Sequence, residues 1–239
     1  IIKWLDTSPS VTLHAYAMLA AALSLLALAQ ALKKAGIEKV TSSGWFLAAV
    51  FALVILPPFC GVLCDREYWL YVLALPWMVQ MLLGVPPLLY TAVFAAVGFC
   101  IKPFNLVLFV ALWLFAGPTG RSLSQKLRAP SLWIMGGVGV LYAAAVWLLY
   151  PDYYLKMIPL ASVAYPQIQV PLLIKLTKAG WAVIPVALLY HAAPGPVRMR
   201  LSIFTAASVA VYMLNSGWTY VDYVLVFPLA LTLAAFLGG

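Results

Sequence analysis

The chain has 239 residues, of which 66% are apolar and only 8% are charged, against about 25% charged residues in an average soluble domain. A soluble fold of this size has too little polar material to cover so much apolar surface. This excludes a water-soluble enzyme, a disordered chain and a nucleic-acid-binding domain. The net charge is +8, but the basic residues form no stripe, so no nucleic-acid partner is expected. We expect an all-α, polytopic transmembrane helix bundle that forms one integral membrane domain over residues 1–239, surrounded by membrane lipid.

The hydropathy pattern predicts about nine apolar helices, several of them short or broken by proline. In chain order they cover residues 11–32, 45–63, 68–83, 86–101, 103–116, 131–150, 179–191, 201–214 and 218–237. A crossing needs about 20 residues, so the short segments must be tilted, lie in thinned membrane or be partly buried in protein.

Nine crossings divide the charged residues unequally between the two membrane faces. One face holds Lys33, Lys34, Lys39, Arg121, Lys126, Arg128, Arg198, Arg200 and Glu38. The other holds Lys3, Arg66, Lys102, Lys156, Lys175, Lys178, Asp6, Asp65, Glu67, Asp152 and Asp222. The positive-inside rule places the first set in the cytoplasm. The acids of the second set lie at the ends of different helices and are candidates to converge on one outward-facing site.

The densest charge cluster is the short turn from Asp65 to Glu67, between two apolar segments. Asp65 and Glu67 are candidate catalytic acids or ligands of a divalent cation, and Arg66 is a candidate to bind a phosphate through two hydrogen bonds. The alternative is a solvated turn whose charges neutralise one another. No metal site is predicted from the cysteines or histidines, because they lack metal-ligand spacing.

Lys102 and Asp222 are ionisable residues within otherwise apolar sequence. Lys102 precedes a proline, which ends a helix and frees backbone groups to line a cavity. Its ammonium is a candidate to bind a lipid phosphate, and the alternative is a lysine that extends to the membrane surface. Asp222 lies one turn into the last predicted helix, where a carboxylate is costly unless paired, and Lys102 and Arg66 are its candidate partners. Trp218 and Tyr220 precede it and also fit an aromatic belt.

Residues 151–178 form the longest polar connection. Long connections of this kind are often lids or binding loops, and aromatic residues such as Tyr154 and Tyr165 suit stacking against a sugar. The alternative is an amphipathic helix that lies on the bilayer surface, and both interpretations can hold together. The Gly136-Gly137-Val138-Gly139 run, by contrast, predicts close packing against another helix.

Five short motifs occur in the order seen in a bacterial family of multispanning proteins of the GT-C glycosyltransferase type. They are Asp65-Arg66-Glu67-Tyr68, Leu75-Pro76, Lys102-Pro103-Phe104, Pro151-Asp152-Tyr153-Tyr154 and Gly217-Trp218-Thr219-Tyr220. The chain resembles this family over nearly its whole length. Two features depart from it. Tyr68 stands where the family has a histidine, and the family's principal catalytic acid would lie upstream of Ile1, in an N-terminal helix and first outer loop that we expect this sequence to lack.

The resemblance implies a multi-pass protein of the bacterial inner membrane that transfers a sugar from a polyprenyl-phosphate donor on the non-cytoplasmic face. The sugar donor and other membrane subunits would be its partners. Asp65, Glu67 and Asp222 would be the catalytic candidates. The substrate-binding candidates are Arg66, Lys102, Tyr154, Tyr165, Trp218 and Tyr220. The alternative function is a non-catalytic subunit of a larger membrane complex, which the short, proline-broken helices also suit.

Overall fold

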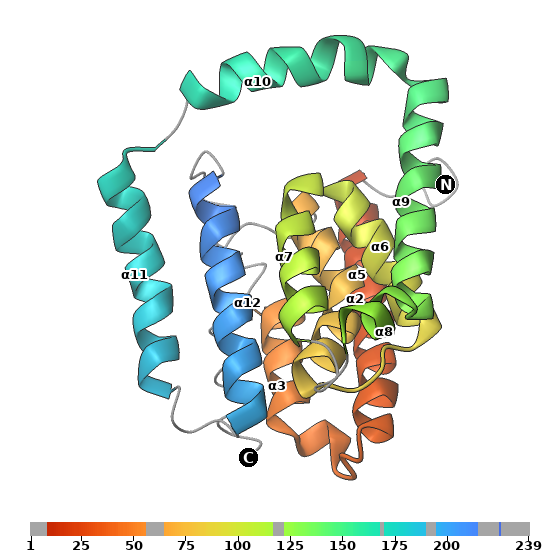
Figure 1. Cartoon of the computed structure of the whole chain (residues 1–239), viewed down its shortest axis with the longest axis vertical. Coiled ribbons are helices and arrows are strands. Elements are labelled where there is room, and N and C mark those ends of the chain that lie inside the picture. Colours follow the sequence, from red (N-terminus) through yellow and green to blue (C-terminus); the bar gives the residue numbers. More distant parts are fainter. Residues whose placement is uncertain are drawn as a thin grey trace.

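The structure is a computed structural model that describes residues 9–55, 65–116, 122–167, 170–189, 195–214 and 225. These residues are almost entirely helical and include no β-strand, which confirms the all-α prediction. Figure 1 shows helices that run up and down beside one another, with one helix, α10, lying across one end of the bundle. We call this end the α10 end.

The described residues form ten α-helices joined by short 3-10 and π-helical turns. The α-helices are α2 (Pro9–Lys34), α3 (Gly44–Val50), α5 (Arg66–Leu83), α6 (Leu89–Ile101), α7 (Leu106–Ala111), α8 (Leu123–Leu127), α9 (Pro130–Leu149), α10 (Ile158–Gln167), α11 (Leu172–Leu189) and α12 (Gly195–Leu214). The 3-10 turns are η1 (Val40–Ser42) and η3 (Pro103–Asn105), and the π-helical turns are η2 (Phe51–Ile55), η4 (Leu112–Ala116) and η5 (Tyr153–Met157).

Three helices within the described ranges are long and apolar enough to cross a membrane: Thr12–Lys34 of α2, α9 and α12. This supports a membrane protein. Four shorter apolar helical stretches, Gly44–Ile55, Tyr68–Leu83, Leu89–Ile101 and Leu106–Ala116, lie between them in the chain. The number of crossings, nine from the sequence, stays a prediction.

Helix α5 is the centre of the core. It packs most extensively against α6 and also contacts α2 and α12, and side chains from Tyr68 to Leu82 are buried around nearly its whole circumference. A helix that is apolar on every side is stable in such a position. Two hydrogen bonds between helices fix it further: Tyr68 donates to the carbonyl of Ala17 over 3.2 Å, and Thr91 donates to Gln80 over 2.7 Å.

The helix ends follow local sequence signals. Gly84 ends α5 in the left-handed region with φ of 75°, where glycine has no side chain to clash. The backbone N–H of Val85 then donates to the carbonyl of Gln80 over 3.0 Å, which closes the last turn. Helix α6 stops at Lys102 because the following proline disfavours helical geometry in the residue before it.

Two expectations from the sequence differ from the structure. Residues 151–178 do not form a loop over the part described: η5, α10 and the first turns of α11 occupy it, which agrees with the helical alternative for this segment. Leucine and alanine favour helix there, and the helical run continues through Pro159, because η5 leads directly into α10. The glycines of α9 also lack the predicted close packing, because no atom of the described residues lies within 4 Å of a Cβ placed on Gly136, Gly137 or Gly139.

Candidate functional site

The candidate site lies at the α10 end, where α5 begins and α6 ends. Asp65 and Arg66 start α5, and Lys102 is the junction between α6 and η3. The side chain of Lys102 is buried, whereas Arg66 is exposed and Asp65 is half-buried. Because α5 and α6 are antiparallel neighbours, residues 36 positions apart in the sequence come to the same end of the bundle.

Charge couples these three residues. The pKa of Lys102 is lowered from its usual 10.5 to about 8, first by burial and next by the positive charge of Arg66, while Asp65 acts in the opposite direction. An ammonium out of water and beside a second cation favours losing its proton, so a bound anion would relieve both effects. Asp65 makes no capping hydrogen bond with its side chain, although the first position before a helix is where an aspartate usually makes one.

An apolar cavity of about 450 Å³ lies next to the turn that contains Lys102, although Lys102 itself is not among its lining residues. Cys100 and Pro103, on either side of Lys102 in the chain, are among its lining residues. The other walls come from α7, α9, η5 and α10. Besides Cys100 and Pro103, the lining residues are Ala96, Phe99, Leu106, Phe109, Leu132, Met135, Gly136, Gly139, Tyr142, Ala143, Tyr153, Tyr154 and Ile158. At Gly136 and Gly139 the backbone of α9 itself forms part of the wall, because glycine has no side chain. The cavity walls are mostly apolar, so the cavity suits a hydrocarbon chain.

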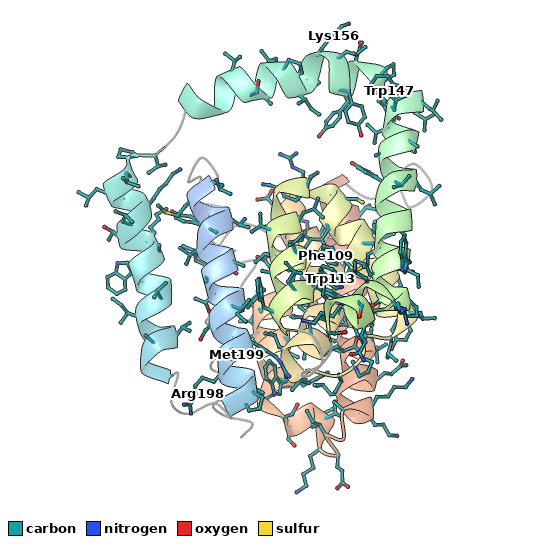
Figure 2. The ribbon with its side chains drawn as sticks, in the orientation of Figure 1. Phe109, Trp113, Trp147, Lys156, Arg198 and Met199 are labelled. Carbon is teal, nitrogen blue, oxygen red and sulfur yellow. The ribbon has the colours of Figure 1, made fainter. Side chains whose placement is uncertain are left out.

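Tyr154 lies in the wall of this cavity. Its ring is 5.6 Å from that of Trp147 and 5.7 Å from that of Tyr153, centroid to centroid, and its hydroxyl donates to the carbonyl of Ala143 over 3.3 Å. These contacts fix η5 against the end of α9. Trp147 and Lys156 are both labelled at this end of the molecule in Figure 2.

Asn105 is a residue that the sequence analysis missed. It is only 1% exposed, and its Oδ1 has no hydrogen-bond partner among the described residues. Its backbone N–H donates to the carbonyl of Lys102 over 3.0 Å, so the amide belongs to the same turn. A buried acceptor without a donor is destabilising, and a ligand hydroxyl would satisfy it. The signal in the sequence was a lone asparagine three residues after Lys102 and between apolar runs.

The remaining candidates are not gathered here. Asp152 pairs with Lys156, one turn away, over 2.9 Å, and both side chains are exposed. Asp222, Trp218 and Tyr220 lie outside the described residues, and so do the side chains of Glu67 and Tyr165. Within the described ranges, no three His, Cys, Asp or Glu residues come together as metal ligands. Tyr68, at the position of the resemblance's histidine, is buried in the core between α5 and α2.

Comparison of the chain with protein-family models, with curated proteins and with solved structures found no match.

Proposed function

We propose that the chain is an integral membrane protein that binds a polyprenyl-phosphate sugar at the α10 end and takes part in transferring its sugar. The observation that carries this proposal is the turn at Lys102, where a buried cation affected by the charge of Arg66 stands between Cys100 and Pro103, two residues that line an apolar cavity of about 450 Å³. A polyprenyl phosphate has the same two parts, a hydrocarbon chain and an anionic head.

Each part of the donor has a counterpart in the site. The prenyl chain would lie in the cavity between α6, α7 and α9. Lys102 and Arg66 would hold the phosphate, and they would stabilise the negative charge that develops on it as the bond to the sugar breaks. Asn105 would accept a hydrogen bond from a sugar hydroxyl. Asp65 has the chemistry to accept the proton of the attacking hydroxyl, and Glu67 and Asp222 stay candidates for that role.

The first test measures binding and transfer separately. Purified protein in nanodiscs is titrated with radiolabelled polyprenyl-phosphate sugar, and membranes that contain the chain are assayed for transfer. Lys102→Ala and Arg66→Ala are each expected to weaken binding at least tenfold, since each removes a charge-assisted hydrogen bond. Lys156→Ala, which removes an exposed lysine paired with Asp152, is the control and is expected to bind normally. Unchanged affinity in both site variants rejects the proposal.

The pH profile supplies a second readout. The donor is a phosphodiester and keeps one negative charge above pH 6, so only the protein titrates. Because the pKa of Lys102 is lowered to about 8, the lysine is charged below that pH and loses its charge above it. Donor affinity should therefore fall as the pH rises through about 8. Lys102→Arg keeps its charge over this range, and its affinity should stay level up to about pH 10.

The second candidate function is a non-catalytic subunit of a larger membrane complex. It is favoured by the open glycine face of α9, where no described atom lies within 4 Å of the added Cβ positions. A partner helix could approach closely there. This function predicts that Gly137→Leu disrupts assembly in native gels and that the Lys102 and Arg66 variants assemble normally and show no binding defect.

A further inference from the structure

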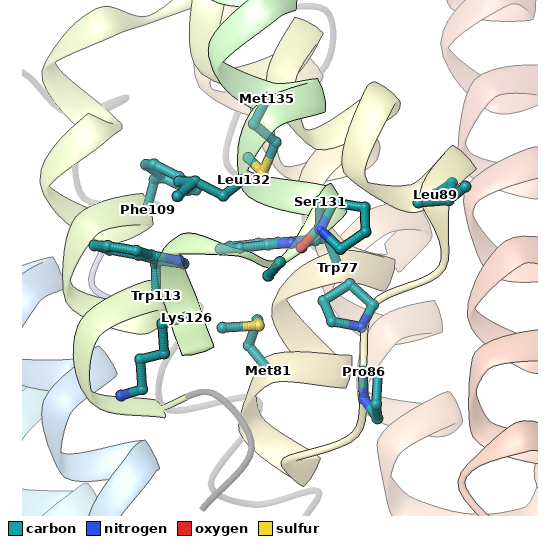
Figure 3. Close-up of a pocket in the computed structure, with 13 residues that line it drawn as sticks. Trp77, Met81, Pro86, Leu89, Phe109, Trp113, Lys126, Ser131, Leu132 and Met135 are labelled. Atoms are coloured by element: carbon teal, nitrogen blue, oxygen red, sulfur yellow. The ribbon is translucent and has the colours of Figure 1, made fainter. Parts of the chain in front are cut away.

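A second cavity, drawn in Figure 3, is lined by residues of α5, η4 and the first turns of α9. Its volume is about 130 Å³. An engineered cavity of about 150 Å³ binds benzene, so this one has room for a single small ring compound. Three aromatic residues, Trp77, Phe109 and Trp113, line it together with methionine and proline side chains. Phe109, Leu132 and Met135 border both cavities, and the other lining residues border this cavity alone.

Two hydrogen-bond donors of this cavity lack acceptors. The Nε1 atoms of Trp77 and Trp113 are both buried and have no partner among the described residues. Trp77 as a whole is only 1% exposed. Figure 3 shows the nitrogen-bearing edge of Trp113 turned toward Trp77 and the centre of the lining residues. An indole N–H can only donate, and no aspartate or glutamate lines the cavity. A ligand would therefore have to bring the acceptor.

The cation among the lining residues is turned away from the aromatic walls. Lys126 is among the lining residues, but its Nζ donates to the backbone carbonyl of Leu114. In Figure 3 its ammonium points away from the aromatic rings. A carboxylate placed between the aromatic rings would lose its hydration without a cation in contact with it, so a neutral acceptor fits better.

We propose that this cavity binds the head group of a neutral quinone, one ring whose carbonyl oxygens accept hydrogen bonds from Trp113 and Trp77. Aromatic walls contact the faces and edges of such a ring, and the two indoles satisfy its two polar atoms. Leu89 lines the cavity and is 56% exposed, so the cavity reaches the outer surface of the bundle, where the tail of a membrane quinone would leave it. This site is independent of the sugar-transfer proposal.

The test compares two ligands that differ only in their carbonyl groups. Duroquinone, which is fully substituted and does not add to thiols, and durene, the same methylated ring without oxygen, are titrated calorimetrically into the purified protein in detergent. Duroquinone is expected to bind one site at least tenfold more tightly than durene. Equal affinities would overturn the proposal, because they would show an apolar cavity without acceptor selectivity.

Variants locate the binding. Trp113→Phe and Trp77→Phe keep an aromatic ring and remove the donor, so each should weaken duroquinone about three- to tenfold and leave durene unchanged. Trp133→Phe is the matched control, because its exposed indole already donates to Leu127 outside the cavity. Ala129→Leu fills the cavity and should abolish binding of both ligands. If both donor variants retain wild-type affinity for duroquinone, or if Ala129→Leu still binds it, the assignment is wrong. Thermal unfolding of each variant verifies that it is folded.

Discussion

At the scale of single residues, the site is defined by polar groups whose environment differs from water. Lys102 is buried beside another cation, and Asn105 is buried with an unmet acceptor. Both features lower the stability of the folded protein. A protein retains such groups where a ligand compensates them, and this is why perturbed groups are good markers of function.

Asn105→Leu separates folding from function. The side chain of Asn105 makes no capping hydrogen bond to α7, and leucine, of similar size, removes the unsatisfied acceptor together with the amide NH2 group. We expect the free energy of unfolding to stay the same or to rise by about 1 kcal/mol. Affinity for the polyprenyl-phosphate sugar should fall about fivefold, because the hydrogen bond to the sugar is lost. Polyprenyl phosphate without a sugar should bind as before, and a parallel loss of its affinity would remove Asn105 from sugar recognition.

Gly84→Ala tests a contact between distant helices. Gly84 has a positive φ, and an added Cβ would overlap Nη1 of Arg200. That guanidinium is buried and donates to the carbonyl of Leu82 over 3.1 Å. We expect the substitution to cost about 1–2 kcal/mol for the backbone strain and about 1.5–3 kcal/mol more for the displaced hydrogen bond to a charged group.

Gly36→Ala is the matched control for this contact. Gly36 also has a positive φ, of 85°, but no atom of the described residues lies within 4 Å of its added Cβ. The Gly36→Ala substitution should lower the free energy of unfolding only by the cost of the backbone strain. Denaturant titration in mixed micelles gives both free energies of unfolding, and equal losses would mean that Arg200 adapts to the extra methyl group without cost.

At the scale of elements, α9 decides the shape of the cavity. Its glycines were expected to pack against another helix, but Gly136 and Gly139 line the cavity instead. The pattern of small residues indicates only that something approaches the backbone closely. Glycines that face a ligand and glycines that face another helix form the same sequence pattern. The sequence alone therefore cannot tell which of the two contacts α9.

Gly139→Leu and Gly137→Leu form a matched pair on α9. Both sites have room for a side chain, but only Gly139 lines the cavity, and both leucines favour the helix equally. Gly139→Leu should displace about two methylene groups of a bound prenyl chain and weaken binding of polyprenyl phosphate about tenfold. Gly137→Leu should bind polyprenyl phosphate with the same affinity as the wild type. If the two variants bind alike in nanodiscs, the chain does not lie in this cavity.

At the scale of the whole molecule, the alternation of helices separates the charges. Lys33 and Lys34 end α2, and Arg198 and Arg200 begin α12, at the end opposite α10. Figure 2 labels Arg198 there and Lys156 at the α10 end. The positive-inside rule then predicts that the α10 end faces away from the cytoplasm.

Two single-cysteine variants test this orientation in a chain whose three native cysteines are replaced by alanine. Ser42 and Ser162 are both exposed, and each donates to a backbone carbonyl three residues earlier. Ser162→Cys, on α10, should react with a membrane-impermeant maleimide in intact spheroplasts. Ser42→Cys, at the opposite end, should react only after lysis. Labelling of both from the same side would contradict the up-and-down topology in the membrane.

The sequence alone determined the helical class, the positions of most helices and the grouping of the charges. Apolar runs and their charged ends carry that information locally, and the all-α prediction is confirmed. The sugar-transfer function stays a prediction. Only the tertiary structure decided which apolar helix lies in the core and which remains exposed. Helix α5 is buried on nearly every side, whereas only 6% of the most apolar window of α9 is buried. Hydropathy cannot distinguish the two, because lipid and protein interior are equally apolar. The two cavities and the unmet polar groups of Asn105, Trp77 and Trp113 likewise depend on contacts between segments far apart in the chain.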